Sequence, residues 1–223
     1  MIIHIGANDM NGGQGLYKEG DKASNHDFIN TNYLNKYDEG YFIECIPSIF
    51  ETLKKNLEYI NKKYLKNYKP ILELVDIETG LDKDFNIIGE KDNNSSKNDC
   101  LAASSMLKPK FILEKFKNLK VHKTLKMKTI TFSDLIKKYN IKLNNKFDLT
   151  LDTQGNELQV LCGMGEYLKN VNFLETEYTD DEYNYYEDGC KFSELNKFLI
   201  NNNFKLFKKD KRIHGNATYK KIN

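Results

Sequence analysis

Short apolar segments that alternate with segments of helical spacing constrain the fold of this chain more than any other feature. Ile2–Ile5, Tyr41–Ile43 and Phe147–Leu151 are three such apolar segments, and each is followed at once by a glycine or a carboxylate. Short continuous apolar runs are typical of strands buried on both faces of a sheet. Strands that alternate with helices predict an α/β domain with a mainly parallel sheet.

The same alternation continues through both halves of the chain. Further strands are predicted at 71–75, 85–88, 129–131, 171–174, 204–207 and 217–219, with 129–131 at a sheet edge and the last two as an antiparallel pair. Helices are predicted near 28–37, after Pro47 with Ser48 as N-cap, over 134–139 with Ser133 as N-cap, after Gly155, and over 192–199. The glycine-containing segment 12–20 and the polar segment 90–100 are expected to be loops.

Length, charge and cysteine spacing narrow the class of protein. A chain of 223 residues is ordinary for one domain, so we expect residues 1–223 to form a single domain. The formal net charge of +2 gives no electrostatic support for nucleic-acid binding. The cysteines lack the close spacing of a zinc site. No apolar run reaches the roughly 20 residues of a membrane span, and no secretory signal is recognisable, so we expect a cytoplasmic location.

Polar residues follow the predicted strands at the end of the sheet where α/β proteins bind their ligands. Gly6 after the first strand allows a sharp turn and a close approach to a ligand. Glu44 after the second strand can accept hydrogen bonds from ribose hydroxyls. The chain has neither the G-x-G-x-x-G nor the G-x-x-x-x-G-K motif that binds phosphates, which disfavours nicotinamide cofactors and nucleoside triphosphates. S-adenosylmethionine contains no phosphate and fits this set of residues.

Six segments resemble one known family in the same order along the chain. They are HIGAND at 4–9, GLY at 15–17, FIECIPSIFETLKKN at 42–56, ASSML at 103–107, TITFSDL at 129–135 and FDLTLDTQGNE at 147–157. The sequence is similar to the FkbM-type S-adenosylmethionine-dependent methyltransferases, and the likeness covers nearly the whole chain. The resemblance implies a Rossmann-like class I methyltransferase fold, in which a mainly parallel seven-stranded sheet has an antiparallel last strand and helices on both faces.

The resemblance also implies an activity and a set of site residues. It implies S-adenosylmethionine as methyl donor and O-methylation of a hydroxyl on a sugar, a glycan or a related small molecule. Asp152 and Glu177 are the candidate catalytic residues, although Asp152 could equally be the N-cap of the next helix. A cation between these two carboxylates is chemically possible, but no spacing requires one, so no metal is predicted. The candidate cofactor-binding residues are Gly6, Ala7, Asn8, Asp9, Glu44, Asp76, Ser104 and Ser105.

Three residues depart from the family pattern. Met10 stands where the opening motif often has glycine, Thr150 replaces a frequent lysine, and Gln154 replaces the glutamate of D-x-E-G. Glutamine keeps an acceptor and adds two donors, but it cannot act as a base. This change leaves open the alternative of a non-catalytic protein that binds S-adenosylmethionine. His214 is a further candidate for facing the substrate, and the tyrosine-rich segment 183–186 is either a stacking surface for a sugar ring or an edge loop.

Overall fold

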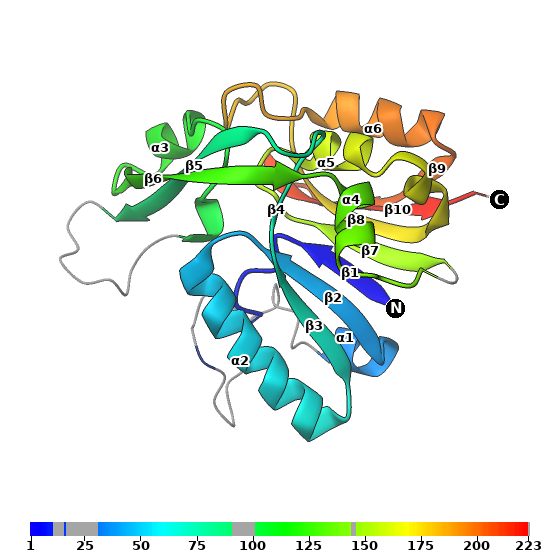
Figure 1. The fold of residues 1–223 in the computed structure, drawn as a ribbon. Helices are drawn as coiled ribbons and strands as arrows, with labels where there is room; N and C mark the ends of the chain where they lie inside the picture. The colour runs from blue at the N-terminus through cyan, green and yellow to red at the C-terminus, as the bar shows by residue number, and fades with distance from the viewer. Residues whose placement is uncertain (11–15, 17–30, 91–100, 144–145, 223) are drawn as a thin grey trace.

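The computed structural model describes residues 1–10, 16, 31–90, 101–143 and 146–222 (Figure 1). These residues form a seven-stranded sheet and a second sheet of three strands. The order in the large sheet is β3-β2-β1-β7-β8-β10-β9, so the first strand lies near its centre. The bounds are β1 (Ile2–Ile5), β2 (Glu39–Glu44), β3 (Asn67–Leu72), β7 (Phe147–Leu151), β8 (Val171–Thr179), β9 (Phe204–Lys209) and β10 (His214–Lys221).

Strand direction confirms the predicted fold class. β1, β2, β3, β7 and β8 are mutually parallel, whereas β10 runs antiparallel to both β8 and β9. The carboxyl ends of the five parallel strands therefore meet at one edge of the sheet. The order reverses direction between β1 and β7, and such a switch point is where open α/β sheets bind ligands.

Helices cover both faces of the large sheet, as predicted (Figure 1). On one face α2 (Pro47–Tyr64) buries an apolar stripe that includes Leu53 and Leu57 against Phe42 of β2. On the other face a larger core surrounds the side chains of β1, β7 and β8. Its helical elements are α4 (Phe132–Lys138), α5 (Glu157–Gly163), the 3-10 helix η2 (Gly165–Asn170) and α6 (Phe192–Asn201). The short helix α1 (Thr31–Lys36) lies within the segment predicted to be helical, of which Phe28 is outside the described residues.

The second sheet corrects two strand predictions. The segment 71–75 is split between β3 and the two-residue strand β4 (Leu74–Val75), which belongs to the small sheet. The segment 129–131 is not an edge strand. Its first two residues are the last two of the long strand β6 (Leu119–Ile130), and β6 lies between β4 and β5 (Asp82–Glu90). β6 is exposed over most of its length and lacks the apolar run of a buried strand. Between β5 and β6 lie η1 (Leu101–Ala103) and α3 (Phe111–Lys115).

Two predicted helix caps are each wrong by two residues. α2 begins at Pro47 itself, with Ile46 as N-cap, because a proline at the first helical position lacks only an N–H that would have no partner. α4 is capped by Thr131, whose hydroxyl accepts a hydrogen bond from the Asp134 N–H. Ser133 lies inside the helix, and its hydroxyl donates to the Met164 carbonyl at 3.0 Å.

The two predicted loops fall largely outside the described residues. Gly12, Gly13, Gly15 and Gly20 lie in the first of them, and 91–100 make up the second. Within the part of the chain that the structure describes, no helix is long and apolar enough to cross a membrane.

Candidate active site

The turn after β1 joins the three central strands at the switch point. Gly6 has φ of +81°, and a Cβ at this position would lie 1.8 Å from the Asp152 carbonyl oxygen. The backbone N–H groups of Gly6 and Ala7 both donate to the Ile43 carbonyl at 3.0 Å. Only glycine allows β1 to turn so close to the end of β7.

The next residues of this turn explain why a glycine often follows Asp9 in the family motif. Asn8 and Met10 both have positive φ, of 50° and 60°. Asparagine tolerates the left-handed conformation, whereas for methionine it carries a steric cost. The Met10 side chain is buried among the residues that α2 covers, and this burial offsets the cost.

Glu44 is buried at the end of β2 and organises the turn. Its Oε2 accepts a hydrogen bond from the Asn8 N–H at 2.9 Å. Its Oε1 accepts from the N–H groups of Cys45 and Ile46, each at 2.8 Å. Burial raises the pKa of Glu44, while these three backbone donors favour its ionised form. A carboxylate has about four acceptor positions, so roughly one of them remains for a ligand.

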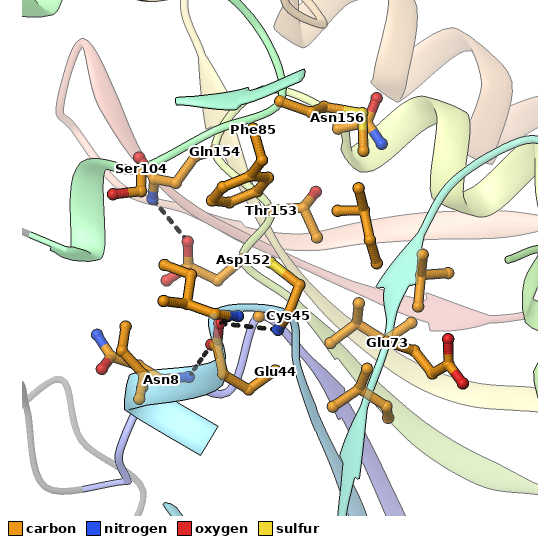
Figure 2. Close-up of a pocket in the computed structure, with 18 of the residues that line it drawn as sticks. Asn8, Glu44, Cys45, Glu73, Phe85, Ser104, Asp152, Thr153, Gln154 and Asn156 are labelled. Carbon is orange, nitrogen blue, oxygen red and sulfur yellow. Dashed lines mark hydrogen bonds between the residues drawn. The ribbon is translucent and has the colours of Figure 1, made fainter. Parts of the chain in front are cut away.

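A pocket opens at the carboxyl ends of β1, β2 and β7 (Figure 2). One wall is apolar and includes Ile46, Ile49 and Phe85. The polar part of the lining is formed by Gly6, Asn8, Glu44, Ser104, Asp152, Thr153, Gln154 and Asn156. The pocket therefore has an apolar side suited to a flat base and a polar side suited to hydroxyl and charged groups.

Asp152 and Glu177 lie at the ends of the adjacent strands β7 and β8, with Gln154 between them. The Gln154 Nε2 donates to Asp152 Oδ1 and to Glu177 Oε2, both at 2.7 Å. The negative charge of Glu177 favours the protonated form of Asp152. Asp152 is exposed to the pocket, whereas the Glu177 side chain is only 13% exposed.

Gln154 itself accepts two further hydrogen bonds. Its Oε1 accepts a hydrogen bond from the Tyr186 hydroxyl at 2.7 Å, and its backbone carbonyl accepts one from the Ser105 hydroxyl at 2.8 Å. Its backbone has φ of 56°, and Gly155 follows with φ of +100°. The amide thus places its two N–H groups on two carboxyls in a fixed orientation. Tyr185 and Tyr186 are buried, so the segment 183–186 is not an exposed stacking surface for a sugar ring.

Two more titratable groups pack against the carboxyl pair. His214 Nε2 lies 2.9 Å from Glu177 Oε1, and its ring stacks on Tyr185 with centroids 4.6 Å apart. Glu157 of α5 accepts hydrogen bonds from the N–H groups of Thr153 and Gly155.

Burial governs the charge of this group. It raises the pKa of Glu177 to about 8, with a further contribution from the negative charge of Glu157. Burial also raises the pKa of Asp152 and of Glu157, and it lowers the pKa of His214. Low local polarity disfavours every charged form, so the site holds protons at neutral pH that exposed carboxyls would have lost.

The predicted site residues divide into two groups. Gly6, Asn8, Glu44, Ser104 and Asp152 line the pocket described above. Ala7, Asp9, Asp76, Ser105 and Glu177 do not line it. Asp152 is not a helix cap, because α5 begins later with Asn156 at its N-cap position.

The residues outside the pocket wall have identifiable contacts. The Asp9 carbonyl accepts from the Asn56 amide, and Asp76 accepts from the Ile77 N–H and the Asn156 amide. Ser104 lines the pocket, but its hydroxyl oxygen accepts from the Ile88 N–H at 3.0 Å. Ser105 and Glu177 reach the site through Gln154. The roles of all these residues toward a cofactor stay predictions.

Some contributors to the site were not predicted from the sequence. Phe85 and Cys45 line the pocket, and Tyr186 fixes Gln154. Phe85 belongs to a predicted strand, but nothing in the sequence places that strand beside the pocket. Tyr186 lies in the quoted tyrosine-rich segment, and only its burial reveals that it supports the motif at 152–155.

No cluster of three or more histidine, cysteine or carboxylate side chains suited to a metal ion occurs among residues 1–10, 16, 31–90, 101–143 and 146–222. The position between the Asp152 and Glu177 carboxyls is instead taken by the Gln154 amide nitrogen.

Comparison with known families agrees with this architecture. Residues 4–206 match the model of the Methyltransferase FkbM domain, which is most of the chain. Comparison with curated proteins and with solved structures gives no match. The matched span begins within β1 and ends within β9, so it includes every strand that contributes to the pocket. The chain belongs to the FkbM methyltransferase family and is a methyltransferase.

Proposed function

We propose that this methyltransferase uses S-adenosylmethionine to methylate a hydroxyl group of a sugar, a glycan or a related small molecule. One observation carries the proposal: a single pocket is lined both by Glu44, a hydrogen-bond acceptor for ribose, and by Asp152, a carboxyl able to accept a proton. Transfer to a hydroxyl releases a proton, so such a pair of functions within one site is what O-methylation needs.

The pocket fits S-adenosylmethionine in the chemistry of its walls. Glu44 keeps roughly one acceptor position for a ribose hydroxyl, since three backbone N–H groups occupy the others. Ile46, Ile49 and Phe85 would contact the adenine, and Gly6 leaves backbone exposed where the ligand passes β1. When bound, S-adenosylmethionine would supply an electrophilic methyl group on a positively charged sulfur.

The protein's own contribution to the reaction is alignment and proton removal. Asp152 is exposed to the pocket and could take the proton of the acceptor hydroxyl. Glu177 is joined to Asp152 through Gln154, and its charge would help to set the charge state of Asp152. Gln154 holds both carboxyls in place, which fixes the base relative to Gly6 and Glu44.

The alternative of a non-catalytic binding protein is not favoured. The reason for considering it was Gln154, which stands where the family motif has a charged glutamate. Gln154 donates to both candidate catalytic carboxyls, so the substitution leaves no unpaired group in the site. Thr150 likewise has a partner, since its hydroxyl lies 2.7 Å from that of Tyr33.

Calorimetric titration with S-adenosylmethionine tests the cofactor assignment. Glu44→Gln keeps the size of the side chain but turns an acceptor into a donor, and it should weaken binding at least tenfold, about 1.4 kcal/mol. Glu73→Gln is the matched control, because Glu73 lines the pocket but is bonded to Lys138 and Tyr139. Equal affinities of wild type and Glu44→Gln would refute the ribose contact. Methyl transfer to a panel of sugars and glycans then tests the acceptor class.

A further inference from the structure

The carboxyl pair Asp152–Glu177 carries a feature that the methyl-transfer proposal does not use. The two groups lie at the ends of β7 and β8 and are bridged by the neutral amide of Gln154, which donates to both at 2.7 Å. The bridge supplies two hydrogen bonds but no positive charge. Two neighbouring carboxylates joined by a neutral donor, one of them largely buried, repel each other, so one proton shared between them is the stable state.

The charged groups around the pair reinforce this state. Glu157 of α5 adds further negative charge beside the pair. His214 of β10 contacts Glu177, but burial and the nearby charge of Lys115 on α3 favour its neutral form. The Tyr186 hydroxyl is neutral and bonds to Gln154. Among the described residues, the one basic side chain that contacts the pair is therefore His214, whose neutral form is favoured.

The position of the pair relative to the cofactor follows from the two sides of the pocket. Adenine suits the apolar side, with Ile46, Ile49 and Phe85, and the ribose suits Glu44. The charged end of the ligand then lies on the polar side, where Asp152 and Gln154 are. S-adenosylmethionine has a positive sulfonium at this end, whereas the sulfur of S-adenosylhomocysteine is neutral.

We propose that Asp152 and Glu177 share one proton in the free protein, release it to solvent when S-adenosylmethionine binds, and retain it when S-adenosylhomocysteine binds. This inference rests on the proposed cofactor. A cation in a site of low polarity favours the loss of a proton from a neighbouring acid, and a neutral sulfur gives no such effect. The site thus distinguishes donor from product by charge.

The proposal also balances the protons of the reaction. With the donor bound, both carboxyls are ionised, and one of them can accept the proton of the acceptor hydroxyl. The acceptor oxygen forms a bond to the methyl carbon, the carbon–sulfur bond breaks, and its electron pair stays on the sulfur. The hydroxyl proton passes to the carboxyl pair. The sulfur becomes neutral as the pair regains its single proton, which restores the charge state of the free protein for the release of the product.

Proton-linked calorimetry tests the inference without knowledge of the acceptor. Each ligand is titrated at pH 7 in buffers of different ionisation enthalpy, which gives the number of protons released on binding. We expect S-adenosylmethionine to release about one proton more than S-adenosylhomocysteine, and its affinity to rise up to about tenfold per pH unit between pH 6 and 8. Asp152→Asn and Glu177→Gln should each remove the difference, since a single carboxyl has no proton to share.

Glu175→Gln is the control, because Glu175 is a partly buried carboxyl on the same strand, burial raises its pKa, and it does not line the pocket. It should leave the difference in proton release unchanged. Equal proton release with both ligands would overturn the inference while leaving the cofactor assignment intact. A difference that persists in both Asp152→Asn and Glu177→Gln would also overturn it. Failure of either ligand to bind wild-type protein would overturn the proposed function itself.

Discussion

Replacing Gly6 by alanine is the most direct test of how the central strands hold the site together. Gly6 has φ of +81°, a conformation that costs an L-residue about 1–2 kcal/mol. An alanine Cβ would also lie 1.8 Å from the Asp152 carbonyl oxygen, so the ends of β1 and β7 would have to separate. The conformational cost and the overlap are two separate contributions to the change in stability.

The cost of the separation can be worked from the hydrogen bonds around Gly6. The Asp152 N–H donates to the Ile5 carbonyl, and the Gly6 and Ala7 N–H groups donate to the Ile43 carbonyl, all three at 3.0 Å. A typical hydrogen bond contributes about 1 kcal/mol net, so loss of all three costs about 3 kcal/mol. With the conformational cost, Gly6→Ala should lower the free energy of unfolding by about 4–5 kcal/mol.

Gly80→Ala supplies the matched control. Gly80 has φ of +87°, nearly that of Gly6, but a Cβ there would meet nothing within 4 Å. Its substitution therefore measures the conformational cost alone. Urea unfolding of both variants should show Gly6→Ala to be less stable than Gly80→Ala by about 3 kcal/mol, which corresponds to a Tm lower by roughly 6–12 °C. Equal losses of stability in the two variants would refute the argument that β1 and β7 are in forced contact at Gly6.

Two further predictions concern the pH dependence of stability and a helix cap. Burial raises the pKa of Glu177 to about 8, whereas in the unfolded chain this carboxyl has its ordinary pKa near 4.5. Between these two values the folded state binds a proton that the unfolded chain has lost. The free energy of unfolding should therefore fall as pH rises from about 5 to 8. Glu177→Gln should flatten this slope, by up to about 1.4 kcal/mol per pH unit in urea unfolding, and an unchanged slope would contradict the assignment. Thr131→Ala removes the hydroxyl that accepts a hydrogen bond from the Asp134 N–H, and it should lower the free energy of unfolding by about 1 kcal/mol. Thr131→Ser keeps a hydroxyl and should lower it much less. Equal losses of stability for the two variants in thermal unfolding would argue against the cap.

The large sheet was predictable because its central strands coincide with short apolar segments of the sequence. Ile2–Ile5 and Phe147–Leu151 are mainly apolar and become fully buried central strands. The carboxylates after the strands identified the edge at which the pocket lies. Glu44 and Asp152 could therefore be proposed as neighbours of one site from strand position alone.

The small sheet was less predictable because its longest strand is largely exposed to solvent and therefore lacks an apolar sequence pattern. β6 has exposed residues along most of its length, and lysines replace the apolar residues that reveal a buried strand. Leu119 at its start and Thr129 and Ile130 at its end are buried, and only the end was recognised. Its place between β4 and β5 depends on pairings that no local pattern records.

The role of Gln154 could not be deduced from the sequence, where it stands only as the loss of a charge. Its contacts come from three other segments of the chain, at Ser105, Glu177 and Tyr186. Such contacts depend on how distant elements pack. A substitution in a motif therefore acquires meaning only when its new hydrogen-bond partners are known.

The central position of β1 has a consequence for how the protein is made. β1 pairs on one side with β2, which follows early in the chain, and on the other with β7, which begins only at Phe147. Contacts between residues so distant in sequence are slow to form. During synthesis the chain thus acquires Glu44 and its side of the pocket long before Asp152 exists to face it. Completion of the sheet and creation of the reaction site are one late event, so a nascent chain that stops before residue 147 cannot begin to act.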